Sequence, residues 1–145
     1  MGLFNAYAPV LADVNLLLQL AIMLILAVSL WFKFKHKYMK HGTIMGLAVA
    51  LHTISIFVVM VPSLLASTGL FADLLNRLTL VILLHAILGS LVEILGLHFL
   101  SVWALNRWVS KECFKNKMKM RVTIVLWVIE FVLGVYVYIL LYTPG

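Results

Sequence analysis

Four histidines stand inside or at the edge of long apolar stretches of this chain. His41 and His52 fall in one stretch, and His85 and His98 fall in the next. A strongly polar side chain in hydrocarbon is costly unless it has a partner or a function. Neutral imidazole nitrogens bind iron, copper and zinc. Ligation of a metal or a metal-containing cofactor is therefore the chemistry that these residues offer.

Their spacing arranges the histidines in two layers if the two stretches are consecutive antiparallel helices. Counted from a shared turn near residue 69, His52 lies 17 positions before the turn and His85 lies 16 after it. His41 lies 28 positions before it and His98 lies 29 after it. At about 1.5 Å of rise per residue, the two layers are roughly 16 to 20 Å apart. We predict one layer near the membrane middle and the other near one face.

Two facing imidazoles within a helix bundle are typical of a bis-histidine haem, and a porphyrin also needs small residues beside its ligands. Gly89 and Gly96 follow His85 by four and eleven residues, on the same helical face. Met45 shares a stripe with His41. The sequence thus predicts one haem b, or two. The predicted haem-binding residues are His52, His85, His41, His98, Gly89, Gly96 and Met45.

The second layer meets a geometrical objection. Thirteen residues turn a helix about 220° past full circles, so His98 points well away from His85. A second haem therefore requires a bend in the helix or another partner for His98. Copper is the alternative metal, although ligands spread over two layers suit flat cofactors better than one small ion.

Glu93 and Glu130 also lie within apolar stretches. Carboxyl groups inside a membrane typically carry protons or bind substrates. We expect these two to handle protons or to bind a quinol hydroxyl; the structural alternative is a protonated, hydrogen-bonded carboxyl. No serine or cysteine has an evident activating partner and no glycine-rich phosphate loop is present, so electron transfer is favoured over a stand-alone enzyme.

Four apolar stretches must position these residues. Of the 145 residues 65% are hydrophobic and 11% are charged, with a mean hydropathy of +1.14, which is typical of an integral membrane protein. Each stretch can cross about 30 Å of hydrocarbon as a helix. Short connections predict a single all-α domain over residues 1–145, an up-down four-helix membrane bundle. The helices are expected over about 14–32, 43–65, 74–105 and 122–141.

The net charge of +6 is concentrated in two connections, at residues 33–41 and 107–121, with Arg77 alone on the other side. The positive-inside rule makes both basic loops cytoplasmic and turns both termini outward. Topology and anionic lipid headgroups account for these charges, so nucleic acid is not expected as a partner. The lone Cys113 excludes an intrachain disulfide.

Three segments, KHGTIMGLAVA, LTLVILLHAILG and RVTIVLWVIEFVLGVYVYILLY, resemble the YozB/CtaM-like family of small four-helix membrane proteins over roughly residues 35–143. His41 and Met45 match the His-x-x-x-Met element of that family, and His85 matches its third-helix histidine. Trp127 and the GVYVY segment match its last helix. The resemblance implies a connection to the maturation of haem-copper oxidases.

The sequence departs from the family pattern at three positions. His52 and His98 are additional, and Asn116 stands where the family has a loop histidine. These departures favour a b-type cytochrome-like protein in the lipid bilayer, which transfers electrons with other respiratory-complex subunits or as a homo-oligomer, with quinol as a candidate donor. The alternatives are an oxidase assembly factor that handles haem or copper transiently and a structural accessory subunit without a cofactor.

Overall fold

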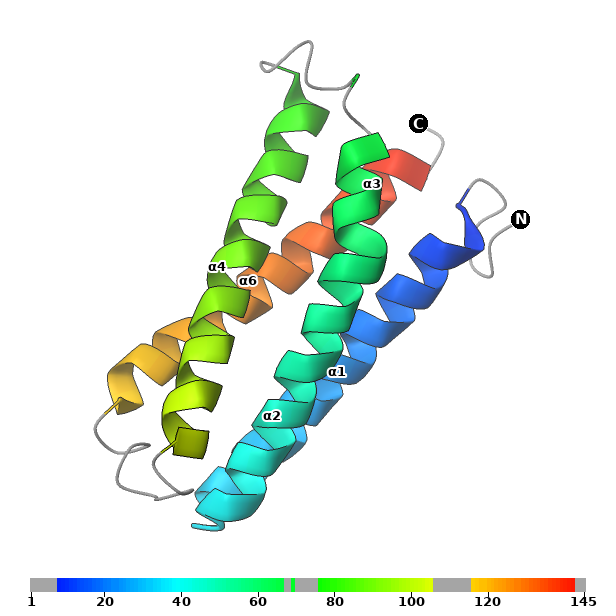
Figure 1. Ribbon diagram of the computed structural model, residues 1–145. Helices are drawn as coiled ribbons and strands as arrows, with labels where there is room; N and C mark the ends of the chain where they lie inside the picture. The colour runs from blue at the N-terminus through cyan, green and yellow to red at the C-terminus, as the bar shows by residue number, and fades with distance from the viewer. Residues whose placement is uncertain (1–7, 67–68, 70–75, 106–115, 143–145) are drawn as a thin grey trace.

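The computed structural model describes residues 8–66, 69, 76–105 and 116–142. Four rods of helix pack together in a bundle, and all four are long and apolar enough to span a membrane (Figure 1). The prediction of an all-α membrane bundle is confirmed at this level. The rods are α1 (Val10–Phe34), the continuous run of α2 (Tyr38–Ser55), η1 (Ile56–Met60) and α3 (Val61–Ala66), α4 (Arg77–Leu105), and α6 (Lys117–Tyr142).

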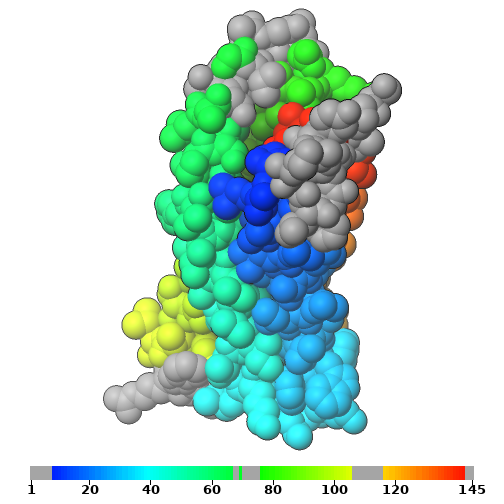
Figure 2. Space-filling view, turned by 90° about the vertical axis from the view of Figure 1, so that its right-hand side faces the viewer, coloured from blue at the N-terminus to red at the C-terminus, as the bar shows by residue number. Residues whose placement is uncertain are grey.

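Neighbouring rods alternate in direction, so that α1 begins and α6 ends at the same end of the bundle (Figure 1). α1 packs mainly against α2, and α4 packs mainly against α6. From the side, α1 and the α2–α3 rod lie next to each other along one face (Figure 2). The bundle is thus two helical hairpins joined through contacts between α2 and α4.

Three of the four helical rods extend beyond the apolar stretches that predicted them, whereas α4 begins at Arg77 and residues 74–75 of its predicted range lie outside the described residues. α1 begins at Val10, α2 at Tyr38 and α6 at Lys117, rather than near residues 14, 43 and 122. Hydropathy marks only the part of a helix that lies in hydrocarbon, whereas backbone hydrogen bonding continues into the polar interface.

A tight turn joins α1 to α2. The Lys37 N–H donates to the Phe32 carbonyl at 2.9 Å and the His36 N–H donates to the Lys33 carbonyl at 3.0 Å, which is the Schellman pattern of a helix end. His36 adopts a φ of 57°, a left-handed conformation that glycine usually provides. Its Nδ1 hydrogen-bonds with the Tyr38 hydroxyl at 2.9 Å. This short turn makes α1 and α2 antiparallel neighbours.

The second rod changes its winding at Ile56–Met60, which form a single turn of π-helix. Pro62 lies two residues after its end. Proline has no N–H to donate, and its ring would clash with the carbonyl four residues earlier, at Val58, in a regular α-helix. The wider turn relieves that conflict. π-turns within α-helices are often found at functional sites.

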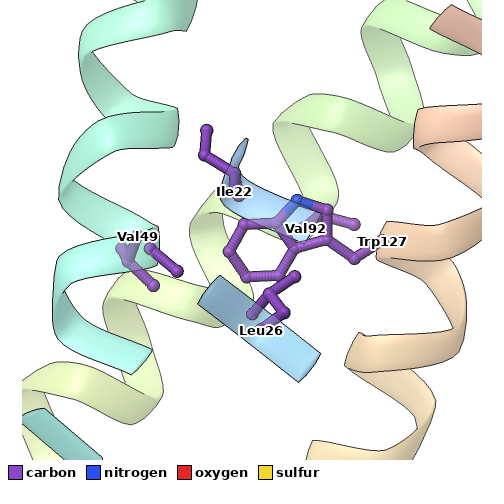
Figure 3. Close-up of a cluster of buried hydrophobic side chains, with 6 residues drawn as sticks. Ile22, Leu26, Val49, Val92 and Trp127 are labelled. Atoms are coloured by element: carbon purple, nitrogen blue, oxygen red, sulfur yellow. The ribbon is translucent and has the colours of Figure 1, made fainter. Parts of the chain in front are cut away.

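The apolar core joins all four rods around one indole. Trp127 of α6 reaches toward Ile22 and Leu26 of α1 and toward Val49 of α2, with Val92 of α4 completing the cluster (Figure 3). Most of the other side chains buried in the described part of the chain are polar, and many large apolar side chains face outward. Polar residues inside and apolar residues outside are the arrangement that a lipid environment requires.

Candidate functional site

His52, Glu93, Glu130 and His85 form one polar network in the middle of the bundle, which we call the central His–Glu network. His52 on α2 contacts Glu93 on α4, with 2.9 Å between Nδ1 and Oε2. Glu130 on α6 lies within reach of both histidines: its Oε2 is 4.0 Å from His52 Nε2 and its Oε1 is 3.5 Å from His85 Nδ1. The structure therefore brings the two deep histidines and the two carboxyl groups selected from the sequence into one network. It pairs them differently from the prediction, because His52 faces Glu93 rather than His85, and Glu130 lies between the two histidines.

Glu93 determines which nitrogen His52 presents to the centre of the bundle. The Thr53 hydroxyl contacts the other oxygen of Glu93 and also the Val49 carbonyl, so each oxygen of this carboxyl group has a partner. When Glu93 is ionised it can only accept, and His52 then donates from Nδ1 while its Nε2 retains the lone pair. The His52 side chain is fully buried, and Nε2 has no hydrogen-bond partner among the described residues.

His85 also has its Nδ1 beside a hydrogen-bond acceptor. Its Nδ1 lies 3.2 Å from the backbone carbonyl of Glu130. Because a carbonyl can only accept, the Nδ1 of His85 carries the proton and Nε2 again holds the lone pair. The side chain of His85 is 16% exposed. Among the described residues, His85 Nε2 makes no hydrogen bond.

Two glycines make room for this network. A Cβ at Gly134 would lie 2.9 Å from His85 Cε1, so only glycine leaves the imidazole in its place. A Cβ at Gly89 would lie 3.5 Å from Glu130 Oε1, an ordinary contact. Gly89 was selected from the sequence, but Gly134 was missed. Its signal was its position four residues after Glu130, on the same helical face.

An outer cavity of about 320 Å³ lies beside the network, in the half of the bundle that contains the chain ends. Glu130 and His85 form part of its wall, together with Gly89 and Gly134. All four rods contribute to the remaining wall, which is mostly apolar. Representative apolar residues are Leu16, Ile82, Val135 and Val59.

Further polar contacts that the sequence did not reveal lie around this half of the bundle. Gln19 donates to Ser55 at 2.8 Å, and Ser55 donates to Asn15 at 2.5 Å. The Tyr138 hydroxyl donates to Asp13, which is fully buried. Asp13 lies in the first turn of α1, and this contact joins α1 to α6.

The histidines of the other layer do not meet. His41 is buried, and its Nδ1 lies 2.7 Å from the Ser29 hydroxyl. Met45 and Gly96 lie with it around a small cavity of about 60 Å³. His98 is exposed on the outside of α4, where its ring edge contacts Phe99. As their spacing predicted, the rotation of α4 between positions 85 and 98 turns His98 away from the face that carries His85.

Gly96 contributes to helix packing at this level. A Cβ on it would lie 3.1 Å from a methyl group of Val49 on α2. Small residues let membrane helices approach closely. Gly96 thus sets the distance between α4 and α2, on the side of the core away from the outer cavity.

The donor set suits a cofactor that needs two protein ligands. Among the described residues, no three His, Cys, Asp or Glu side chains converge as a metal-ion site. A haem iron takes four ligands from the porphyrin and needs only two imidazoles. A macrocycle between His52 and His85 requires the Glu130 carboxyl group to move, because that group contacts both rings. Cys113 lies outside the described residues.

Comparison of the chain with known protein families, with characterised proteins and with solved structures finds no match. The resemblance to the YozB/CtaM-like family stays a prediction.

Proposed function

We propose that this protein is a small b-type membrane cytochrome that holds one haem between His52 and His85. The observation that carries the proposal is the set of hydrogen-bond partners of the two imidazoles. Each has its Nδ1 beside an acceptor, Glu93 for His52 and the Glu130 carbonyl for His85. Among the described residues neither Nε2 has a hydrogen-bond partner, and that of His52 is fully buried.

This is the pattern that metal ligation requires. Histidines that bind metals through one nitrogen usually donate the other ring N–H to a carboxylate or a backbone carbonyl, which sets the tautomer and the ring orientation. A purely structural pair would be expected to satisfy both nitrogens of a fully buried ring. Ligation would remove the cost of the unpartnered Nε2 of His52.

Glu130 would move when haem enters. Its carboxyl group lies at the wall of the outer cavity, which offers it space. Gly89 and Gly134 keep the surroundings of Glu130 and His85 free of side chains. The haem, when bound, supplies one-electron transfer. Glu93 would hold the His52 ring in place throughout.

The proposal includes one haem rather than two, because His98 faces away from His41. Copper is the less suitable metal, because no third ligand converges with His52 and His85 among the described residues. The proposed partners are respiratory-complex subunits or a second copy of the chain, with a quinol as electron donor.

The proposed placement in the cell membrane is an up-down bundle with both termini outward and with the basic segments at 33–41 and 107–121 on the cytoplasmic side. The supporting observation is the charge asymmetry. The central His–Glu network would then lie near the middle of the bilayer, and the outer cavity in its outward half.

The test is the haem content of the full chain, purified from cells supplied with a haem precursor. We expect one haem per chain, with a reduced-minus-oxidised difference spectrum of the b type. His52→Ala and His85→Ala should each lower haem content at least tenfold. His36→Ala and His98→Ala are matched controls, because both histidines are exposed, and should retain it.

Three results would overturn the proposal. A colourless, metal-free protein would identify a structural subunit. Weak, exchangeable haem or copper would identify a transient carrier of the assembly-factor kind. Full haem content in folded His85→Ala would exclude this site.

A further inference from the structure

The outer cavity has the features of a ligand site in its own right. Its volume, about 320 Å³, is at the lower end of the range of roughly 300–1,000 Å³ that small-molecule sites occupy. Its wall is mostly apolar and has few polar groups. Such a wall selects an apolar molecule with a small number of polar atoms.

Glu130 supplies the polar group that a ligand would address. The residue lines the cavity and is 1% exposed. Its Oε2 is buried, lies 4.0 Å from His52 Nε2 and has no hydrogen-bond partner among the described residues, so a ligand in the cavity reaches it when the carboxyl group turns toward the cavity. A buried acceptor without a donor is costly. A ligand hydroxyl that reaches Oε2 would remove that cost, so the site favours a hydrogen-bond donor at the inner end of an apolar molecule.

The cavity also reaches the lipid-facing surface. Leu11 of α1, Val61 of α3 and Leu141 of α6 line it and are also 51%, 38% and 41% exposed. A ligand can therefore enter from the bilayer and leave an alkyl tail between the helices. The π-turn at Ile56–Met60 contributes wall residues on this side as well.

We infer that the outer cavity binds the ring of a lipid-soluble hydroquinone, whose hydroxyl donates a hydrogen bond to Glu130 Oε2. A flat ring with hydroxyl groups and an apolar tail matches the polar atom, the apolar wall and the opening to lipid. The inference builds on the proposed function, since it assigns the site of the quinol donor, but the binding itself needs no haem.

The experiment measures binding of decylhydroquinone to the haem-free full chain in lipid nanodiscs, by equilibrium dialysis under anaerobic conditions. The comparison probe is the dimethyl ether of the same molecule, which has the same ring and tail but no hydroxyl. We expect the hydroquinone to bind at least tenfold more tightly than its ether. Glu130→Leu should abolish this difference, and Glu130→Gln should reduce it.

Two further variants locate the site. Ala86→Phe places a large side chain into the cavity wall and should prevent binding of both probes. Thr123→Val is the control, because Thr123 is a buried polar residue of the same helix that does not line the cavity, and it should bind both probes as the natural chain does. Circular dichroism and gel filtration establish that each variant is folded.

Equal affinity for the two probes would overturn the inference, because it would describe an acyl-chain or detergent site without hydroxyl recognition. An unchanged preference in folded Glu130→Leu, or unchanged binding in folded Ala86→Phe, would also overturn it. Because the measurement uses haem-free protein, its failure would leave the haem proposal intact, and an absence of haem would leave this result intact.

Discussion

At the scale of single residues, the hydrogen bond from His52 to Glu93 sets the chemistry of the centre. Thr53 and His52 together engage both oxygens of Glu93. In Glu93→Gln the amide can donate to Nδ1, which shifts the proton to Nε2 and removes its lone pair. Loss of such a supporting carboxylate costs about 10–100-fold in metal affinity. We therefore expect haem titration of Glu93→Gln to show a similar loss, and any residual haem to have a raised midpoint potential.

The matched control is Glu130→Gln, which makes the same chemical change near the other nitrogen of His52. Glu130 Oε2 lies 4.0 Å from that nitrogen and makes no hydrogen bond to it. Its haem affinity should stay within about threefold of the natural chain. Equal affinity and equal potential in Glu93→Gln and the natural chain would show that Glu93 does not position the ligand.

At the scale of helices, the contact between α2 and α4 depends on a glycine placed against an aromatic ring. A Cβ at Gly42 would overlap the indole of Trp103, and Trp103 is 5% exposed. Overpacking at such a contact typically costs about 1–3 kcal/mol. We expect Gly42→Ala to lower the free energy of unfolding by that amount, measured by thermal or SDS denaturation in detergent micelles.

Gly69→Ala is the control for this helix contact, since a Cβ there meets nothing within 4 Å. Its free energy of unfolding should lie within about 0.5 kcal/mol of the natural value, as for most surface substitutions. Equal stability of Gly42→Ala and Gly69→Ala would mean that Trp103 can leave its position without cost.

At the scale of the whole molecule, the distribution of charge predicts an orientation in the membrane. Among the described residues, lysine and arginine gather where α1 is joined to α2 and where α6 begins, with Arg77 at the start of α4 as the exception. Cys113, the one cysteine of the chain, belongs to a basic segment. We expect a membrane-impermeant maleimide to leave Cys113 unlabelled in intact cells and to label it after permeabilisation.

The opposite result is expected for a cysteine on the other side. In a Cys113→Ser background, Gly69→Cys should be labelled in intact cells, because the α3–α4 connection would face outward. Labelling of Cys113 before permeabilisation, with protection of the cysteine at 69, would reverse the orientation. The outer cavity would then open toward the cytoplasmic half of the bilayer.

Depth along a single helix follows from sequence alone, because every helical residue rises by the same distance, but the register between two helices does not. The count from a shared turn predicted His52 and His85 at one level. In the structure Glu93 lies beside His52, and His85 lies eight positions, about 12 Å, from Glu93 along α4, so the two histidines are linked through Glu130. The same regular rotation predicted that His98 would leave the face of His85. These properties depend on local geometry, which the order of residues encodes directly.

Tertiary structure alone decided which side chains touch. Glu93 contacts His52 across 41 positions of the chain, and Tyr138 contacts Asp13 across 125. Such pairs depend on how each helix is turned about its axis and on which helices are neighbours, and both are set by packing of the whole bundle. For that reason the Nδ1 partners of the two imidazoles, the clearance at Gly134 and the outer cavity became visible only when the helices were assembled.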